Sequence, residues 1–169
     1  RQEIKDALAY LRLIHNRQDD AALERVINTP ARGIGETTMN KVRQHARTSQ
    51  QTLWLALEQL LAEQQLSGRA ANAIEQFMQL IGTLDSELAA LPLHEQTEHV
   101  IKQSGLYAMY QAEKGEKAQT RIENLNELIT ACQNFDSPLQ EEMSPLAAFL
   151  SQAALEAGEY QAEEHSDAV

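Results

Sequence analysis

The sequence is poor in the residues that build disulfides, sheets and membrane spans. Among its 169 residues there is one cysteine, Cys132, which excludes an intramolecular disulfide and disfavours both a disulfide-rich secreted scaffold and a cysteine-based zinc site. Aromatic residues make up 5%, valines are few, and the abundant Ala, Leu, Gln and Glu favour helices over strands. No uninterrupted apolar run approaches the roughly 20 residues that span a bilayer. We therefore expect a soluble, all-α chain with no membrane partner.

The common sequence motifs of catalysis are also missing. There is no G-x-x-x-x-G-K-[ST] loop for phosphates, no H-E-x-x-H and no G-x-S-x-G. The histidines are scattered, and His94 and His99 lie five residues apart, off the spacing that lets two imidazoles share a metal on one helix face. Cys132 falls on the apolar stripe of a predicted helix, which favours a core position over a nucleophile. The sequence predicts no catalytic residue, metal or cofactor in this chain.

Charge is distributed unevenly along the chain. The net charge is -11, which argues against a general nucleic-acid-binding surface. Residues 1–50, however, hold nine Lys or Arg against six Asp or Glu, whereas the rest hold five against nineteen. Between residues 25 and 47, which we call the basic segment, five cations face a single acidic residue, Glu36: Arg25, Arg32, Lys41, Arg43 and Arg47. An anionic partner would bind there, although exposed arginines that are simply solvated give the same pattern.

Apolar residues recur at helical spacing along most of the sequence. The spacing predicts eight or nine helices in a single compact domain, near residues 4–14, 20–29, 37–48, 52–61, 74–88, 93–105, 106–113, 122–135 and 145–158. Capping side chains are expected at Asp19 or Asp20, at Thr52, and at Ser144, which precedes a proline suited to the first helical position. We expect a disordered loop over residues 136–143.

The two ends of the sequence differ in what they predict. The chain starts without Met, with helical periodicity already under way at Ile4, so we expect a fragment of a longer protein. At the other end we expect Gly158 to close the last helix, so that residues 1–158 form the domain. Residues 159–169 are then an acidic tail or linker that frays.

The turn between the second and third predicted helices is the one segment whose pattern indicates chemistry. Two glycines with positive φ would let an anion approach successive N–H groups, and the following helix N-terminus would attract the same anion. An isoleucine between them would anchor the turn to the core, while an arginine and a lysine would flank it. This pattern is typical of helix-hairpin-helix elements, which contact DNA through its backbone. A structural turn that merely needs two glycines is the alternative. The residues are Arg32, Gly33, Ile34, Gly35, Thr37, Thr38 and Lys41.

Four segments resemble the UvrD-like DNA helicases. Residues 1–13 are similar to the stretch that follows helicase motif IV, and residues 25–35 to the family's N-x-P-x-R-G-I-G segment. Residues 121–128 resemble its R-x-x-N-L-x-E-L helix, and residues 146–155 a helix near the end of the same insertion. Order and spacing agree over nearly the whole chain.

The resemblance implies that residues 1–158 are subdomain 2B, the all-α insertion in the second RecA-like domain of a superfamily 1A helicase. Such helicases are ATP-driven 3′ to 5′ enzymes of DNA repair and replication, so the resemblance implies ATP and Mg in the parent and a cytoplasmic, nucleoid-associated bacterial protein. The motifs for ATP hydrolysis are absent from this chain. The implied partners are duplex DNA, the parent's other subdomains and DNA repair proteins. The resemblance also assigns the duplex-backbone contact to Arg32, Gly33, Ile34 and Gly35, and extends it to Thr37, Thr38 and Lys41.

Two functions therefore remain open. The first is a regulatory module that binds duplex DNA through the glycine turn. The second is a protein-interaction module in which the acidic surface beyond residue 51 recruits partners and the glycine turn is structural.

Overall fold

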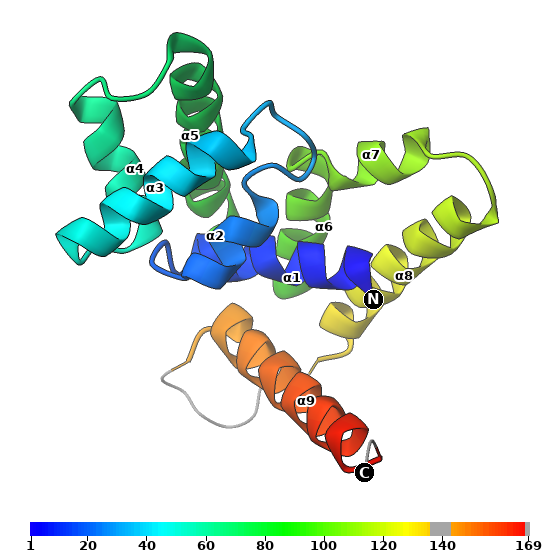
Figure 1. The fold of residues 1–169 in the computed structure, drawn as a ribbon. Helices are drawn as coiled ribbons and strands as arrows, with labels where there is room; N and C mark the ends of the chain where they lie inside the picture. Colours follow the sequence, from blue (N-terminus) through cyan, green and yellow to red (C-terminus); the bar gives the residue numbers. More distant parts are fainter. Residues whose placement is uncertain (136–142, 168–169) are drawn as a thin grey trace.

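Helices form all the regular structure in the described part of the chain. The computed structural model describes the backbone of residues 1–135 and 143–167, and side chains up to residue 158. Within these ranges there are nine helices and no strand, in one compact domain (Figure 1). They are α1 Gln2–His15, α2 Asp20–Val26, α3 Glu36–Ser49, α4 Leu53–Ala62, α5 Gly68–Leu88, α6 Leu93–Gln103, α7 Leu106–Ala112, α8 Glu116–Gln133 and α9 Pro145–Asp167. The predicted all-α fold is confirmed.

Helix α1 lies at the centre of the domain. It packs against α2, α5, α6, α8 and α9, which places both halves of the chain around the first helix. In Figure 1, α3, α4 and α5 lie together on one side of α1, whereas α6, α7 and α8 lie on the other. Tyr10, Leu11 and Leu13 of α1 are fully buried, because a helix surrounded by others must be apolar on more than one face.

Capping side chains fix several helix starts as predicted. Asp19 accepts from the Ala22 N–H at the start of α2, and Thr52 accepts from the Leu55 N–H at the start of α4. Ser144 accepts from the Ala147 N–H at 3.1 Å, with Pro145 as the first residue of α9. Each cap satisfies a donor that the first turn of a helix leaves without a partner.

The predicted end of the last helix is wrong. We expected Gly158 to close it, but α9 continues through Gly158 to Asp167. Glycine closes a helix only where the backbone turns left-handed, and Gly158 has no positive φ. Inside a helix it costs only about 1 kcal/mol relative to alanine, which good helix-forming neighbours offset. The loop expected over residues 136–143 falls almost entirely outside the described residues.

Candidate nucleic-acid interface

The turn between α2 and α3 contains both glycines in exposed positions. Gly33 has φ +81°, as predicted, because only a residue without a Cβ adopts this conformation without strain. Gly35 does not: its φ of -88° is open to any residue, and it serves as the N-cap of α3. A Cβ built on either glycine would meet nothing within 4 Å. The fold therefore requires a glycine at position 33 but not at position 35.

The inner side of the turn is closed by hydrogen bonds. The Oδ1 atom of Asn28 accepts from the Arg32 N–H at 2.7 Å and from the Ile34 N–H at 3.3 Å. The Ile34 side chain is 2% exposed and belongs to the core cluster, so it anchors the turn as the sequence predicted. The turn is therefore held both by a side-chain acceptor and by a buried apolar residue.

The outer side of the turn presents free donors. Gly35 has no side chain to cap α3, and the first backbone bond of this helix runs from the Met39 N–H to the Gly35 carbonyl at 3.1 Å. Among the described residues, the N–H groups of Glu36, Thr37 and Thr38 have no partner. Such donors, together with the positive end of the helix dipole, favour an anion at this end of α3.

Arg32 does not flank the turn with a free charge, contrary to the sequence-based expectation. Its guanidinium points into the domain, where Nη1 donates to the Val26 carbonyl at 2.9 Å and to the Ile27 carbonyl at 3.1 Å. Nη2 donates to the Tyr10 hydroxyl at 2.6 Å, and the group lies over the Phe77 ring, 5.0 Å from its centroid. Arg32 thus satisfies the last carbonyls of α2 and connects the turn to α1 and α5.

Two other cations of the basic segment are paired with carboxylates. Arg43 donates to Glu36 at 3.1 and 3.2 Å and also to Glu24, and these hydrogen bonds raise the pKa of Arg43 while lowering the pKa of Glu36. Arg25 binds the buried carboxylate of Asp6 at 2.8 Å. These pairs reduce the positive charge that a ligand meets.

The remaining two cations are exposed on α3. Lys41 donates its Nζ to the Gln65 carbonyl, which is a neutral partner and leaves the full charge in place. Arg47 has no ion pair among the residues whose side chains are described. The face near the α3 N-terminus therefore has few uncompensated cations, and neutral N–H groups supply much of its attraction for anions.

A buried polar network was not foreseen from the sequence. Asp6 is 2% exposed and accepts from both Arg25 and the Tyr110 hydroxyl, the latter at 3.0 Å. Glu3 is 4% exposed and accepts from the Asn124 amide at 2.7 Å. Burial, and then the nearby Asp6 charge, raise the pKa of Tyr110. The available signal was the spacing of Glu3, Asp6 and Tyr10, which places two acids on one helix face with a buried tyrosine.

The R-x-x-N-L-x-E-L segment has a structural role in this network. Asn124 connects α8 to α1 through Glu3, and its Oδ1 also accepts from Arg1 at 3.2 Å. The Arg121 guanidinium lies 5.5 Å from the centroid of the Tyr110 ring. These polar residues therefore fix the position of α8 relative to α1 and α7.

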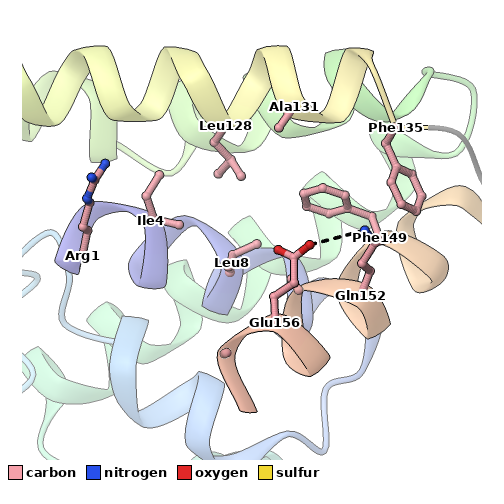
Figure 2. Close-up of a pocket in the computed structure, with 11 residues that line it drawn as sticks. Arg1, Ile4, Leu8, Leu128, Ala131, Phe135, Phe149, Gln152 and Glu156 are labelled. Atoms are coloured by element: carbon pink, nitrogen blue, oxygen red, sulfur yellow. Dashed lines mark hydrogen bonds between the residues drawn. The ribbon is translucent and has the colours of Figure 1, made fainter. Parts of the chain in front are cut away.

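A second surface feature is an apolar groove of about 640 Å³ between α1, α8 and α9. Figure 2 shows Ile4 and Leu8 on one wall, with the rings of Phe135 and Phe149 at one end. The two rings meet edge to face, with centroids 5.4 Å apart. The full lining is Arg1, Ile4, Leu8, Leu128, Ala131, Phe135, Phe149, Gln152, Ala153, Glu156 and Ala157.

Elsewhere in the described part of the chain, few side chains are arranged for chemistry. Over the described residues, no cluster of three His, Cys, Asp or Glu side chains has the arrangement to hold a metal ion. Cys132 is buried within 3.3 Å of the Thr97 hydroxyl, and burial raises the pKa of its thiol, which opposes thiolate chemistry. None of the described helices is both long enough and apolar enough to cross a bilayer.

Comparison with known proteins accounts for the whole sequence. The UvrD-like helicase C-terminal domain family matches residues 1–169. The chain is 61% identical to DNA helicase II of Escherichia coli and 58% identical to that of Haemophilus influenzae, each over all of this chain. It is 37% identical over 92% of its length to the ATP-dependent DNA helicase PcrA of Bacillus subtilis. The chain spans about a quarter of the length of these relatives. The chain therefore belongs to the UvrD-like helicase C-terminal domain family.

Proposed function

We propose that this chain is subdomain 2B of an ATP-dependent 3′ to 5′ DNA helicase of bacterial DNA repair and replication, and that it binds duplex DNA to regulate unwinding. The names of the relatives support a helicase parent, because the chain covers about a quarter of proteins called DNA helicase II. ATP and Mg bind to the parent outside this chain, whose sequence contains no phosphate loop. The module itself is a binding element and not a catalyst.

The proposal rests on the free N–H groups and the exposed glycine on the outer side of the turn. The N–H groups of Thr37 and Thr38, which have no partner within the described part of the chain, lie beside Gly35, a position where the fold itself does not demand glycine. The absence of a Cβ at Gly35 is useful if the backbone of another molecule must approach this position closely. A phosphate fits, because it accepts several N–H bonds at once and is attracted by the helix dipole.

Each residue of the turn has a separate role in this proposal. Gly33 gives the turn its shape, Gly35 admits the phosphate, and the N–H groups of Thr37 and Thr38 donate to it. Lys41 adds a charge one helical turn further on. Ile34 and Arg32 hold the turn from inside and do not contact DNA. Since none of these contacts reaches a base edge, binding is independent of sequence.

The proximity of residues from the first and last helices supports an insertion in a parent domain. Arg1 and Ala157 line the same groove, although they lie at opposite ends of the described side chains. An inserted subdomain requires its entry and exit on one side, where both connect to the other subdomains of the parent.

The experiment compares Gly35→Ala with Gly82→Ala in the 169-residue chain, binding a labelled duplex of mixed sequence by fluorescence anisotropy. Both added methyl groups enter open space, so both variants should fold, as circular dichroism will verify. We expect Gly35→Ala to weaken binding at least about tenfold, since the added methyl group displaces the phosphate from a charge-assisted hydrogen bond that contributes about 1.5–3 kcal/mol. Gly82→Ala should bind like the parent chain. Equal binding by both variants contradicts the proposal.

A protein-interaction module is a second candidate, favoured by the apolar groove between α1, α8 and α9. A partner such as a DNA repair protein would bury the apolar walls formed by Leu8, Leu128 and Phe149. The two functions respond differently to salt, because phosphate contacts weaken steeply as salt rises, whereas an apolar interface hardly changes.

A further inference from the structure

The Oδ1 atom of Asn28 holds the shape of the turn between α2 and α3. Asn28 follows the end of α2, is itself exposed, and uses its Oδ1 as the common acceptor for the Arg32 and Ile34 N–H groups. We infer that Asn28 is a positioning residue for phosphate binding, which fixes the donors of the turn before DNA arrives. This inference rests on the proposed function of the turn.

Along residues 32–35 of the turn, N–H groups with a partner alternate with N–H groups that have none among the described residues. Asn28 satisfies the N–H groups of alternate residues, 32 and 34, on the inner side. Among the described residues, the intervening Gly33 and the following Gly35 have no partner for their N–H groups. Because Asn28 binds the N–H groups of residues 32 and 34, the N–H groups of Gly33 and Gly35 are left available to a ligand.

Glycine makes such a support necessary. A turn with glycines at positions 33 and 35 loses more conformational entropy on ordering than any other composition would. If the turn were mobile in the free protein, that entropy would be lost on binding and would weaken the complex. Because the Asn28 hydrogen bonds already order the turn in the free, folded protein, the donors are arranged before phosphate binds.

The chemistry of asparagine matches an anionic ligand. Aspartate offers the same acceptor geometry and is equally typical of such turns, but it would place a negative charge beside the phosphate. Asparagine supplies a neutral acceptor. The residue at position 28 is thus the one that closes the turn without repelling DNA.

The test measures amide exchange and duplex binding in the 169-residue chain and four variants, which are Asn28→Ala, Asn28→Asp, Asn16→Ala and Gly35→Ala. We expect Asn28→Ala to accelerate amide exchange at Arg32 and Ile34 by NMR and to weaken duplex binding about tenfold, because the turn must then be ordered at the moment of binding. The slope of log affinity against log salt should not change, because no charge is lost. Asn28→Asp should restore the exchange protection yet bind duplex less tightly than the parent chain.

Asn16→Ala is the matched control, because Asn16 also accepts a local backbone bond, from the Gln18 N–H at 3.0 Å, outside the turn. It should change neither exchange in the turn nor binding. Normal binding by Asn28→Ala, with Gly35→Ala still defective, overturns the inference and leaves the proposed function intact. Normal binding by both variants overturns both. If Asn28→Ala does not fold, loss of exchange protection in Asn28→Asp overturns the inference, and its retention together with weakened binding supports it.

Discussion

At the scale of single residues, Arg32 and Lys41 carry the same charge in different surroundings. Arg32 donates to the Val26 and Ile27 carbonyls inside the domain, whereas Lys41 is exposed on α3. We expect Arg32→Ala to lower the free energy of unfolding by about 2–4 kcal/mol, because it leaves these carbonyls without a donor. Urea denaturation measures this. A change under 0.5 kcal/mol would contradict the inward role.

Lys41→Ala should show the opposite behaviour. Its free energy of unfolding should stay within about 0.5 kcal/mol of the parent chain, as for most surface substitutions. The salt slope of duplex binding should become shallower by about one unit, if the ammonium group meets a phosphate. Titrations at several salt concentrations measure this slope, and a slope that is unchanged would remove Lys41 from the interface.

Because of Tyr110, we expect the free energy of unfolding to depend on pH in the alkaline range. Burial and the Asp6 carboxylate raise its pKa, so the neutral phenol is favoured in the folded state. Its contribution to stability is therefore complete below the unfolded-state pKa of about 10 and is lost as pH rises toward the higher folded-state pKa.

The matching variant is Tyr110→Phe, which loses the 3.0 Å hydrogen bond to Asp6. It should be about 1 kcal/mol or more less stable at pH 7, because Asp6 loses a buried partner. Above pH 10 the parent chain should lose stability faster than the variant, by up to about 1.4 kcal/mol per pH unit. Urea denaturation at pH 7, 10 and 11 measures both. Parallel pH profiles would show that Tyr110 does not titrate with unfolding.

At the scale of elements, helical periodicity and caps predicted most of the architecture. Asp19, Thr52 and Ser144 each accept a hydrogen bond from the N–H group three residues further on. All three predicted caps are confirmed. Gly158 failed as a stop signal because glycine alone does not end a helix whose neighbours still favour it. Local sequence therefore predicts where helices begin better than where they end.

The glycines at positions 82 and 105 should respond in opposite ways to alanine. Gly82 lies inside α5 with open space for a Cβ, so Gly82→Ala should stabilise the chain by about 0.5–1 kcal/mol. Gly105 has φ +91°, and its Cβ would lie 3.2 Å from Pro30 Cγ. Gly105→Ala should therefore destabilise the chain by at least about 1–2 kcal/mol. Thermal denaturation ranks the two variants, and the reverse order would contradict this description of the α6–α7 junction.

At the scale of the whole molecule, the net charge of -11 opposes the approach of DNA, so binding should be weak. With Lys41 and Arg47 as the exposed cations of α3, about two phosphates are neutralised, and the expected salt slope is about -2. Affinity should not differ between AT-rich and GC-rich duplexes. Anisotropy titrations between 25 and 200 mM salt check both, and a slope near zero would favour the protein-interaction function instead.

The contacts that the sequence did not reveal are those between distant elements. The buried acids Asp6 and Glu3 find their partners Tyr110 and Asn124 more than 100 residues away, so no local pattern reveals these pairs. Arg32 looked like a ligand for anions for the same reason, since Ser104 and Phe77 become its neighbours only after folding. Charge in the sequence therefore indicates a basic segment but not which of its cations remain free after folding.

The central position of α1 has a consequence for the order of folding. Helix α1 precedes α8 and α9 in the sequence by about 100 residues or more, so the faces of α1 against which they pack stay uncovered until both later helices have been synthesised. Contacts across such long sequence separations slow folding, because the chain must close large loops before they form. Meanwhile Glu3 and Asp6, still hydrated, keep the nascent helix from being wholly apolar. The same two acids that fasten the finished domain would thus protect its unfinished form from aggregation.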